Sequence, residues 1–289
     1  MGNLFKTALL LGVLTSVLVL LGGALGGQHG MLLALVMAAV MNFGAYWFSD
    51  KLALAMSGAR PIDESQAPQL YGMVRNLATR AQLPMPRVYM IPEDAPNAFA
   101  TGRNPEHASV AVTQGLLDRL NRVELEGVLA HELAHVKNRD MLVNTLAATL
   151  VGVVVLLAGW MRWGLFWGGG RGRDRGGGGG GAFPILIVIG ILAAILAPLA
   201  AQLIRFAVSR RREYQADATG ARIAGRPSGL ASALEKMEMA AGMARMQPAP
   251  ATAHLYIVNP LTGGGLASLF STHPPIQERV ARLRAMATV

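Results

Sequence analysis

The sequence contains no cysteine among its 289 residues, and only 15% of them are charged. The absence of cysteine excludes a disulfide framework and thiolate ligands for a metal ion. It also fits a domain that faces the cytoplasm. Soluble domains carry about 25% charged residues, so the low charge and the 52% hydrophobic content predict an integral membrane protein. We expect about half of its length to lie outside the bilayer.

The charge balance is basic, with a formal net charge of +9. A basic chain suits nucleic acid or anionic lipid. Many of the basic residues lie near the ends of apolar runs, where they suit lipid headgroups. No nucleic-acid motif and no basic patch interleaved with aromatic residues is present. We therefore expect the lipid bilayer as a partner and no nucleic acid, and the sequence sets no oligomeric state.

Four apolar runs have the length of membrane spans: Leu4–Leu25, Met31–Phe48, Met141–Trp160 and Ile185–Ile204. The first run also resembles a signal peptide. However, the second follows after a short uncharged loop, Gly22–Gly30, so an uncleaved hairpin is the favoured interpretation. Tyr46 and Trp47 end the second run, as an aromatic belt would. The last two runs predict a second hairpin.

These runs divide the chain into four segments. Residues 1–49 form the N-terminal hairpin, and 50–140 the first part of a catalytic domain. Residues 141–206 form the second hairpin, whose residues 164–182 are a connector rich in glycine and arginine. Residues 207–289 form the second part of the domain. The connector lacks the GK[ST] of a phosphate loop and suits a flexible link.

The polar segments predict short helices and strands. Alternating β-branched residues predict strands at Arg87–Ile91 and Ser109–Thr113. From residue types alone, the segment between them, Asn97–Gly102, is an ordinary loop. Helical spacing and end signals predict helices over Glu64–Gln82, Gly115–Leu120, Val123–Lys137, Arg205–Arg222, Ser228–Arg245 and Ile276–Met286.

The central motif is His131-Glu132-Leu133-Ala134-His135, an H-E-x-x-H match. On a helix, the histidines at i and i+4 share one face, so both imidazoles reach one ion. Glu132 projects about 100° away and can touch a water on that ion. A zinc hydrolase needs this arrangement of neutral nitrogen ligands, an open position and a carboxylate. The alternative is an amphipathic helix with two hydrogen-bonded histidines.

A catalytic zinc needs a third protein ligand. If the last two runs form an antiparallel hairpin, His135 and Glu213 lie about 9 Å and about 13 Å from the bilayer edge by helical rise, so Glu213 can join the pair. Asp217 lies level with His131 and can support that imidazole from behind. Asp140 lies on the histidine helix itself, below the ion, and is taken as a cap or interface residue. The candidates weighed were Asp140, Glu213, Asp217, His254 and His273.

The chain resembles the HtpX proteases, bacterial membrane-bound zinc metalloproteases related to the CaaX prenyl proteases. The resemblance covers essentially the whole chain, including the two pairs of apolar runs. Its motifs are HELAH at 131–135, EYQAD at 213–217, PNAFATG at 96–102 and STHPP at 271–275.

The resemblance implies one zinc ion held by His131, His135 and Glu213, with Glu132 as general base. It implies cleavage of misfolded membrane proteins as a stress response, by a catalytic domain on the cytoplasmic side of the inner membrane. In similar proteases the Asn97, Ala98 and Phe99 segment is an edge strand to which substrate adds. His273 is then a possible oxyanion donor; otherwise it is a helix-start residue, and His254 is structural.

The predicted fold is mainly α and integral to the membrane. It combines four transmembrane helices in two hairpins with an α+β, zincin-like catalytic domain that has a small edge-strand sheet. The arginines at 162, 171, 173 and 175 lie in or beside the loop of the second hairpin, on the side of the membrane opposite the catalytic domain. Basic residues favour the cytoplasmic side, so these arginines argue against a cytoplasmic catalytic domain, but more basic residues flank the catalytic side. Two alternative functions remain. An inactive, metal-stabilised scaffold for quality-control partners would need no general base such as Glu132. A transporter would need charged residues or broken helices within its spans, and these spans carry almost no charge.

Overall fold

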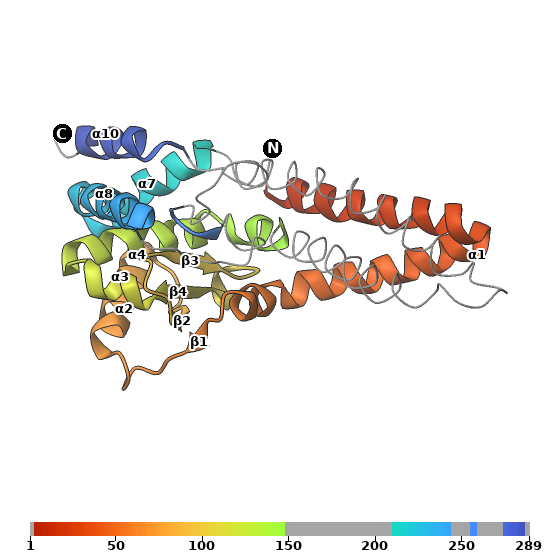
Figure 1. Ribbon diagram of the computed structural model, residues 1–289, viewed down its shortest axis with the longest axis horizontal. Coiled ribbons are helices and arrows are strands. Elements are labelled where there is room, and N and C mark those ends of the chain that lie inside the picture. Colours follow the sequence, from red (N-terminus) through yellow and green to blue (C-terminus); the bar gives the residue numbers. More distant parts are fainter. Residues whose placement is uncertain (1–2, 148–209, 244–254, 259–273, 287–289) are drawn as a thin grey trace, which may run out of the picture.

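The chain folds into a long helical hairpin joined to a unit in which helices cover a small sheet (Figure 1). A computed structural model describes residues 3–147, 210–243, 255–258 and 274–286. The third and fourth predicted spans lie outside these residues, except for the start of the third. The predicted set of four membrane helices is therefore not confirmed.

The hairpin is α1, Asn3–Met56, which reverses direction at Gly26 and Gly27. Gly27 has φ of +57°, a conformation that glycine adopts at low cost. The turn is thus tighter than the predicted loop Gly22–Gly30, because helix continues through most of that loop. Within the described residues, the one helix long and apolar enough to cross a membrane is Gly26–Met56.

Two contacts hold the arms of α1 together. Gly22 and Gly30 meet so closely that a Cβ on Gly30 would lie 2.1 Å from the carbonyl oxygen of Gly22. Nearer the open end, Asn42 Nδ2 donates a 2.8 Å hydrogen bond to Thr15 Oγ1. Small residues and side-chain hydrogen bonds are the usual means of packing helices in lipid. These contacts support the predicted hairpin interpretation of the first two runs.

A four-stranded mixed sheet follows, in the order β1-β2-β4-β3. β2 (Arg87–Ile91) and β4 (Ser109–Thr113) are parallel and have the bounds predicted from their alternation. β3 (Ala98–Thr101) pairs antiparallel with β4 and lies at one edge. The loop expected here from residue types was wrong, whereas the edge strand implied by the resemblance is confirmed. β1 (Arg60–Pro61) lies at the other edge.

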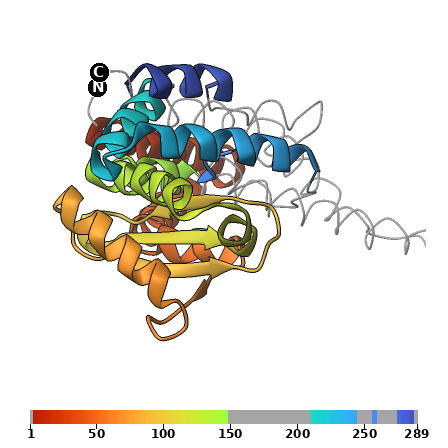
Figure 2. The same cartoon turned by 90° about the vertical axis from the view of Figure 1, so that its left-hand side faces the viewer.

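Helices cover the sheet, and α4 (Arg122–Lys137) lies at their centre (Figures 1 and 2). It begins with a capping box in which Asn121 and Glu124 bond each other's backbone N–H groups. Its buried residues from Leu125 to Val136 occupy nearly every side of the helix, because α2, β3, α7 and α8 all pack on it. The other helices of this part are α2 (Pro68–Ala81), α3 (Gln114–Arg119) and a 3₁₀ turn at Pro105–His107.

The C-terminal helices are α7 (Arg210–Ala224), α8 (Pro227–Met243) and α10 (Ile276–Met286), whose bounds match the prediction for that helix. α7 packs on α4 where Gly220 lies against the backbone of His131, and a Cβ there would be 2.9 Å from His131 Cα. α8 approaches α4 in the same way at Gly229 and Gly127. These glycines set the depth at which α7 and α8 lie on the histidine helix. We call β1–β4 and their helices the sheet–helix unit.

Candidate metal centre

The two motif histidines lie on one face of α4, as their spacing predicts. His131 is 1% exposed and His135 is 9% exposed. Their Nε2 atoms lie 3.2 Å apart, and the rings meet edge to face with centroids 4.8 Å apart. Two imidazoles that converge through the same kind of nitrogen, inside the fold, can share one cation.

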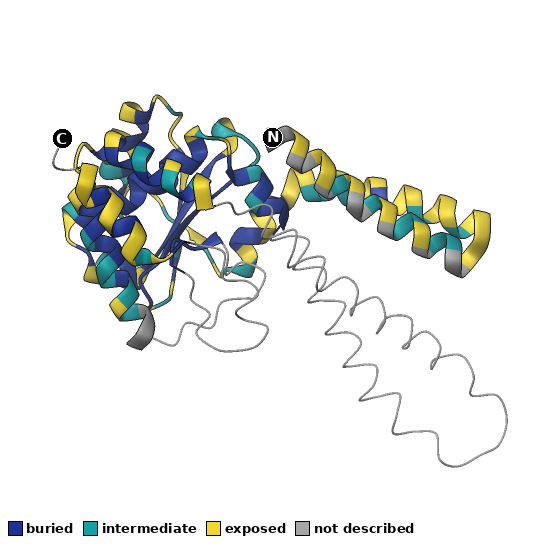
Figure 3. Cartoon of the chain, turned by 90° about the horizontal axis from the view of Figure 1, so that it is seen from above, coloured by how far each residue is buried: buried dark blue, intermediate teal, exposed yellow. Residues whose placement is uncertain are grey.

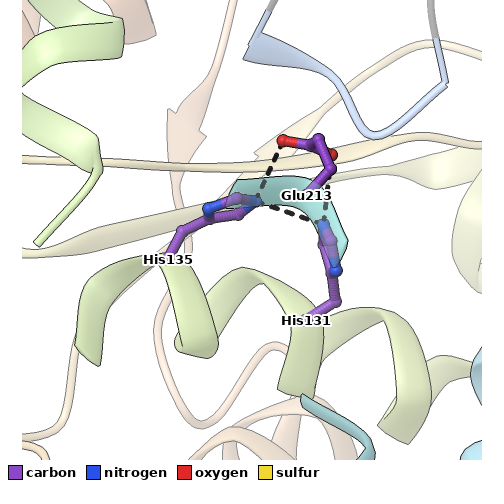
Figure 4. Close-up of side chains that lie close together, drawn as sticks. All are labelled: His131, His135 and Glu213. Atoms are coloured by element: carbon purple, nitrogen blue, oxygen red, sulfur yellow. Dashed lines mark hydrogen bonds and ion pairs between the residues drawn. The ribbon is translucent and has the colours of Figure 1, made fainter. Parts of the chain in front are cut away.

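Glu213 completes the group from the first turn of α7 (Figure 4). Its Oε1 lies 3.6 Å from His135 Nε2 and its Oε2 lies 3.9 Å from His131 Nε2. The carboxylate is 3% exposed. One ligand atom from each of the three residues falls within 4.8 Å of the others. The structure thus brings together the ligand set His131, His135 and Glu213 that the sequence predicts.

These separations can be compared with the requirements of a metal ion. Zinc binds histidine nitrogen and carboxylate oxygen at about 2.0–2.1 Å with tetrahedral angles, which places neighbouring ligand atoms about 3.3–3.4 Å apart. The two Nε2 atoms are 3.2 Å apart, and each lies 3.6 or 3.9 Å from a different oxygen of Glu213, so a contraction of the group by less than about 1.5 Å brings one oxygen and both nitrogens to that spacing. Two histidines and one carboxylate also form a donor set of catalytic zinc sites that keep a fourth position open. The residues therefore fit such an ion.

A carboxylate lies behind His131. Asp217, one turn along α7 from Glu213, places Oδ1 2.9 Å from His131 Nδ1. The pair is close in distance although the N–H is not ideally aligned with the oxygen. A carboxylate on Nδ1 leaves Nε2 free to bind a metal. This is the supporting position that helical rise predicts for Asp217.

Asp217 is itself held by a fully buried arginine, Arg279 of α10. Its Nε and Nη2 donate to the two carboxylate oxygens at 2.9 Å and 2.7 Å, a bidentate pair. Nη1 also lies 3.9 Å from Glu213 Oε2. The sequence analysis missed Arg279. However, it follows Ile276 by three residues and precedes Leu283 by four, so it falls within the apolar stripe of α10.

His135 has a carboxylate behind it as well. Asp140 Oδ2 lies 3.5 Å from His135 Nδ1, and Asp140 Oδ1 lies 3.5 Å from Arg212 Nε. The premise that Asp140 lies on the histidine helix was wrong. α4 ends at Lys137, and Arg139 has φ of +57°, so the chain turns back and the Asp140 N–H bonds the His135 carbonyl. Asp140 lies outside the ligand group but contacts one of its members.

The two imidazoles differ in proton affinity. Burial lowers the pKa of His131 to about 4, and Asp217 only partly opposes this effect. Burial also acts to lower the pKa of His135, but Asp140, Glu213 and Glu132 outweigh it and raise that pKa to about 9. The pKa of Asp217 falls to about 2, because the pull of Arg279 and His131 exceeds the effect of burial. In the metal-free protein, His135 therefore carries the proton.

Glu132 lies beside the ligands and is 2% exposed. Burial raises the pKa of its carboxyl to about 8, against the opposing charge of His135. The backbone N–H of Ala100, on β3, bonds this carboxylate. A cation bound close by would favour the ionised form. The arrangement places a proton acceptor between the ligand group and the edge strand.

Of the predicted substrate-binding residues, Ala98 and Phe99 begin β3 and Asn97 directly precedes it, and each is at most 2% exposed. Their free edge contacts another part of the same chain, Leu255–Val258, instead of solvent. No sequence signal pointed to this segment. His273, the predicted oxyanion donor, and His254 lie outside the described residues.

Comparisons with known proteins show which sequences this chain is similar to. The sequence profile of peptidase family M48 matches residues 64–287. A protein of Syntrophobacter fumaroxidans named "Protease HtpX homolog" is 58% identical, over 99% of this chain and 100% of its own. A protein of the same name from Desulfatibacillum aliphaticivorans is 55% identical over 98% of this chain and 89% of its own. The crystal structure of S. mikatae Ste24p aligns with a TM-score of 0.48 at 18% identity, covering 86% of this chain and 57% of that one.

A profile match over most of the chain, together with full-length relatives above half identity, establishes the family. The buried group of two histidines and a glutamate has the ligand types that the metal site of a metalloprotease requires and could hold a metal ion. The chain therefore belongs to peptidase family M48, among the HtpX-type membrane proteases.

Proposed function

We propose that this protein is a zinc-dependent endopeptidase whose ligands are His131, His135 and Glu213 and whose general base is Glu132. The observation that carries the proposal is the convergence of three buried ligand atoms beside a buried carboxyl whose pKa is raised to about 8. A purely structural metal site has no use for such a carboxyl, so the scaffold alternative is not favoured. Zinc in a site of this kind polarises a water molecule and a peptide carbonyl.

The side chains supply the proton transfers and the geometry. Glu132 accepts a proton from the attacking water and then delivers it to the leaving nitrogen of the peptide. Asp217 and Asp140 hold the two imidazoles by their Nδ1 atoms, so that both Nε2 atoms face the ligand position. His273 is proposed as a donor to the oxygen on which charge develops, on the basis of the resemblance alone.

We propose that the substrates are misfolded or damaged membrane proteins, cleaved during stress in the inner membrane. Two features support this. The hairpin α1 exposes large apolar side chains along its length, including Leu20 and Leu32, which suits lipid contact (Figure 3). The same helix continues past Phe48, so that Ala53 and Leu54 pack with Phe99 of the edge strand. The sheet–helix unit is thereby fixed close to the bilayer.

We further propose a multi-pass chain with four spans in two hairpins and a catalytic domain that faces the cytoplasm. The catalytic domain is assigned to 50–140 and 207–289, the hairpins to 1–49 and 141–206. The basic residues near the catalytic side support this orientation. They include Lys51, Arg60, Lys137, Arg210 and Arg212.

Glu132→Gln tests the proposal directly. The purified variant, stripped by a chelator and reloaded with zinc, is expected to bind one zinc and to lose cleavage by about 10²–10⁴-fold, the usual effect of a general base. Glu126→Gln is a matched control on the same helix, since Glu126 pairs with exposed Arg122 away from the site. Full cleavage by Glu132→Gln at equal zinc content would contradict the proposal.

A further inference from the structure

The segment Leu255–Val258, which we call the strap, runs along the free edge of β3. The Ile257 N–H donates to the Ala98 carbonyl at 3.3 Å, and Val258 bonds Asn97. One step further, the rings of Tyr256 and Phe99 meet edge to face with centroids 5.3 Å apart. Residue numbers rise along β3 as they fall along the strap, so the two segments are antiparallel. The strap thus lies where an additional strand would join this sheet.

Asn97 holds the strap by a two-point contact with its main chain. Asn97 Nδ2 donates to the Val258 carbonyl at 2.7 Å, and the Val258 N–H donates to Asn97 Oδ1 at 3.3 Å. The side-chain amide therefore bonds both polar groups of one residue, as a neighbouring strand would. These contacts involve only main-chain atoms of Val258 and do not depend on its side chain. A residue of another peptide offers the same two groups.

The strap also closes the metal centre. A cavity of about 10 Å³ lies beside the three ligands, and Leu255, Ile257 and Ala100 contribute to its walls. That volume suffices for about one water molecule and cannot hold a peptide. The strap residues are 8%, 1%, 2% and 7% exposed in chain order. A peptide bond therefore needs part of this wall to move, and the strap forms the part of it that lies on the edge of β3.

The strap is joined to the metal centre through Arg279. Arg279 Nη1 donates to the Ile257 carbonyl at 3.3 Å while its other nitrogens bind Asp217. The same guanidinium therefore contacts the strap and the acid that supports His131. Loss of the strap contact leaves the bidentate pair in place, so the strap can leave without breaking the support of the imidazole.

We propose that the strap is an internal occupant of the substrate position on β3 and that a substrate strand displaces it to reach the metal centre. The proposal rests on the proposed protease function. The incoming chain takes over the Ala98 carbonyl and the Asn97 amide, and the closed cavity is the resting state. A purely structural strap would instead stay in place when substrate binds.

Thiol labelling tests displacement without relying on cleavage. Because the chain has no cysteine, Leu255→Cys introduces a single thiol that a maleimide can report. The measurement uses the full-length, zinc-loaded Glu132→Gln protein in detergent, with and without an unfolded, cysteine-free casein. Casein is expected to raise the labelling rate by at least about tenfold, as local opening does. Leu77→Cys, buried in α2, is the control for global unfolding and should stay slow.

An unchanged rate at Leu255→Cys, or an equal rise at Leu77→Cys, would overturn the proposal. Because the labelling rate and not cleavage is measured, this result is independent of whether Glu132 is the general base. Failure of the proposed function would appear separately, as absent cleavage by the wild-type protein.

A second variant tests the consequence for activity. Ile257→Pro removes the N–H that bonds Ala98 but keeps the carbonyl that accepts from Arg279. Weakening one hydrogen bond of the resting state is expected to raise kcat/KM for casein by about fivefold, at unchanged zinc content. The rise should exceed that of Ile257→Val, which keeps the N–H. A fall in kcat/KM with zinc fully bound would contradict displacement.

Discussion

Along the second arm of α1, Leu32, Leu33 and Val40 expose 63%, 66% and 65% of their surface. In the sheet–helix unit, Arg279, His131 and Glu132 expose 0%, 1% and 2%. One region therefore presents apolar side chains outward, and the other encloses charged ones. Figure 3 shows the same contrast as a mostly exposed hairpin beside a unit with a buried interior. The hairpin relies on its surroundings for solvation, since lipid is the solvent that suits it. The buried charged groups are stabilised by ion pairs and hydrogen bonds with one another, so the loss of one partner leaves the other without compensation.

Breaking a buried pair should have the largest effect. Arg279→Met leaves Asp217 buried without its bidentate partner and is expected to lower the free energy of unfolding by about 3–5 kcal/mol. Chemical denaturation in detergent would measure it. Arg282→Met is the control, because Arg282 lies on the same helix with a side chain 52% exposed. Equal midpoints for the two variants would show that the buried pair is dispensable.

Replacing a leucine by alanine in each of the two regions compares the contribution of a buried and an exposed side chain to stability. Leu133→Ala removes a side chain that is 1% exposed in α4 and is expected to cost about 2–5 kcal/mol of stability. Leu33→Ala changes a side chain that is 66% exposed on α1 and is expected to stay within about 0.5 kcal/mol. Unfolding midpoints of both variants in one detergent give the comparison. A large loss for Leu33→Ala would mean that the hairpin surface packs on another part of the protein.

Removing the charge of the carboxylate behind His131 should have a smaller effect, measured as a change in zinc affinity. Asp217→Asn removes the charge that holds His131 Nδ1 and is expected to weaken zinc affinity by about 10–100-fold. Competition with a chromophoric chelator measures this change. Asp118→Asn, at an exposed position on α3, is the control. Unaltered affinity in Asp217→Asn would remove Asp217 from the metal centre.

The smallest expected effect for a single step is that of a change of one pH unit. Zinc needs a neutral His135, and its neighbours raise the pKa of this imidazole to about 9 in the metal-free protein. Below that pH, binding displaces a proton from His135, and below about pH 8 it also favours ionisation of Glu132, so zinc affinity should rise by at least about tenfold for each unit of pH increase. Chelator competition at pH 6, 7 and 8 tests the sign and the slope. A flat profile would show that the buried group holds no proton at neutral pH.

The sequence predicted those parts of the structure that depend on local periodicity. The β-branched alternation of Arg87–Ile91 and Ser109–Thr113 identified both parallel strands. Helical spacing placed His131 and His135 on one face. Helical rise also predicted that Glu213 lies near the two histidines, and the structure places it beside them. The second hairpin, on which that argument depended, lies outside the described residues.

The features that were missed depend on chain reversal or distant contacts. Asp140 reaches His135 because Arg139 adopts a left-handed conformation, which no residue type required. Arg279 was not singled out from the sequence, although its spacing places it among the apolar residues of α10. The strap has no periodicity of its own, and its pairing with Asn97 joins residues far apart in sequence. Such pairings follow from the assembled tertiary structure and leave no local pattern.

The position of Arg279 in the chain affects the timing of biosynthesis. The histidine helix leaves the ribosome well before Glu213, and Arg279 follows later still. At about 5–20 residues per second, several seconds separate the appearance of Glu213 from that of α10. During this interval a nascent chain has both histidines and the glutamate but lacks the guanidinium that holds Asp217. The support behind His131 is therefore completed only after α10 has been synthesised, later than the ligand group itself.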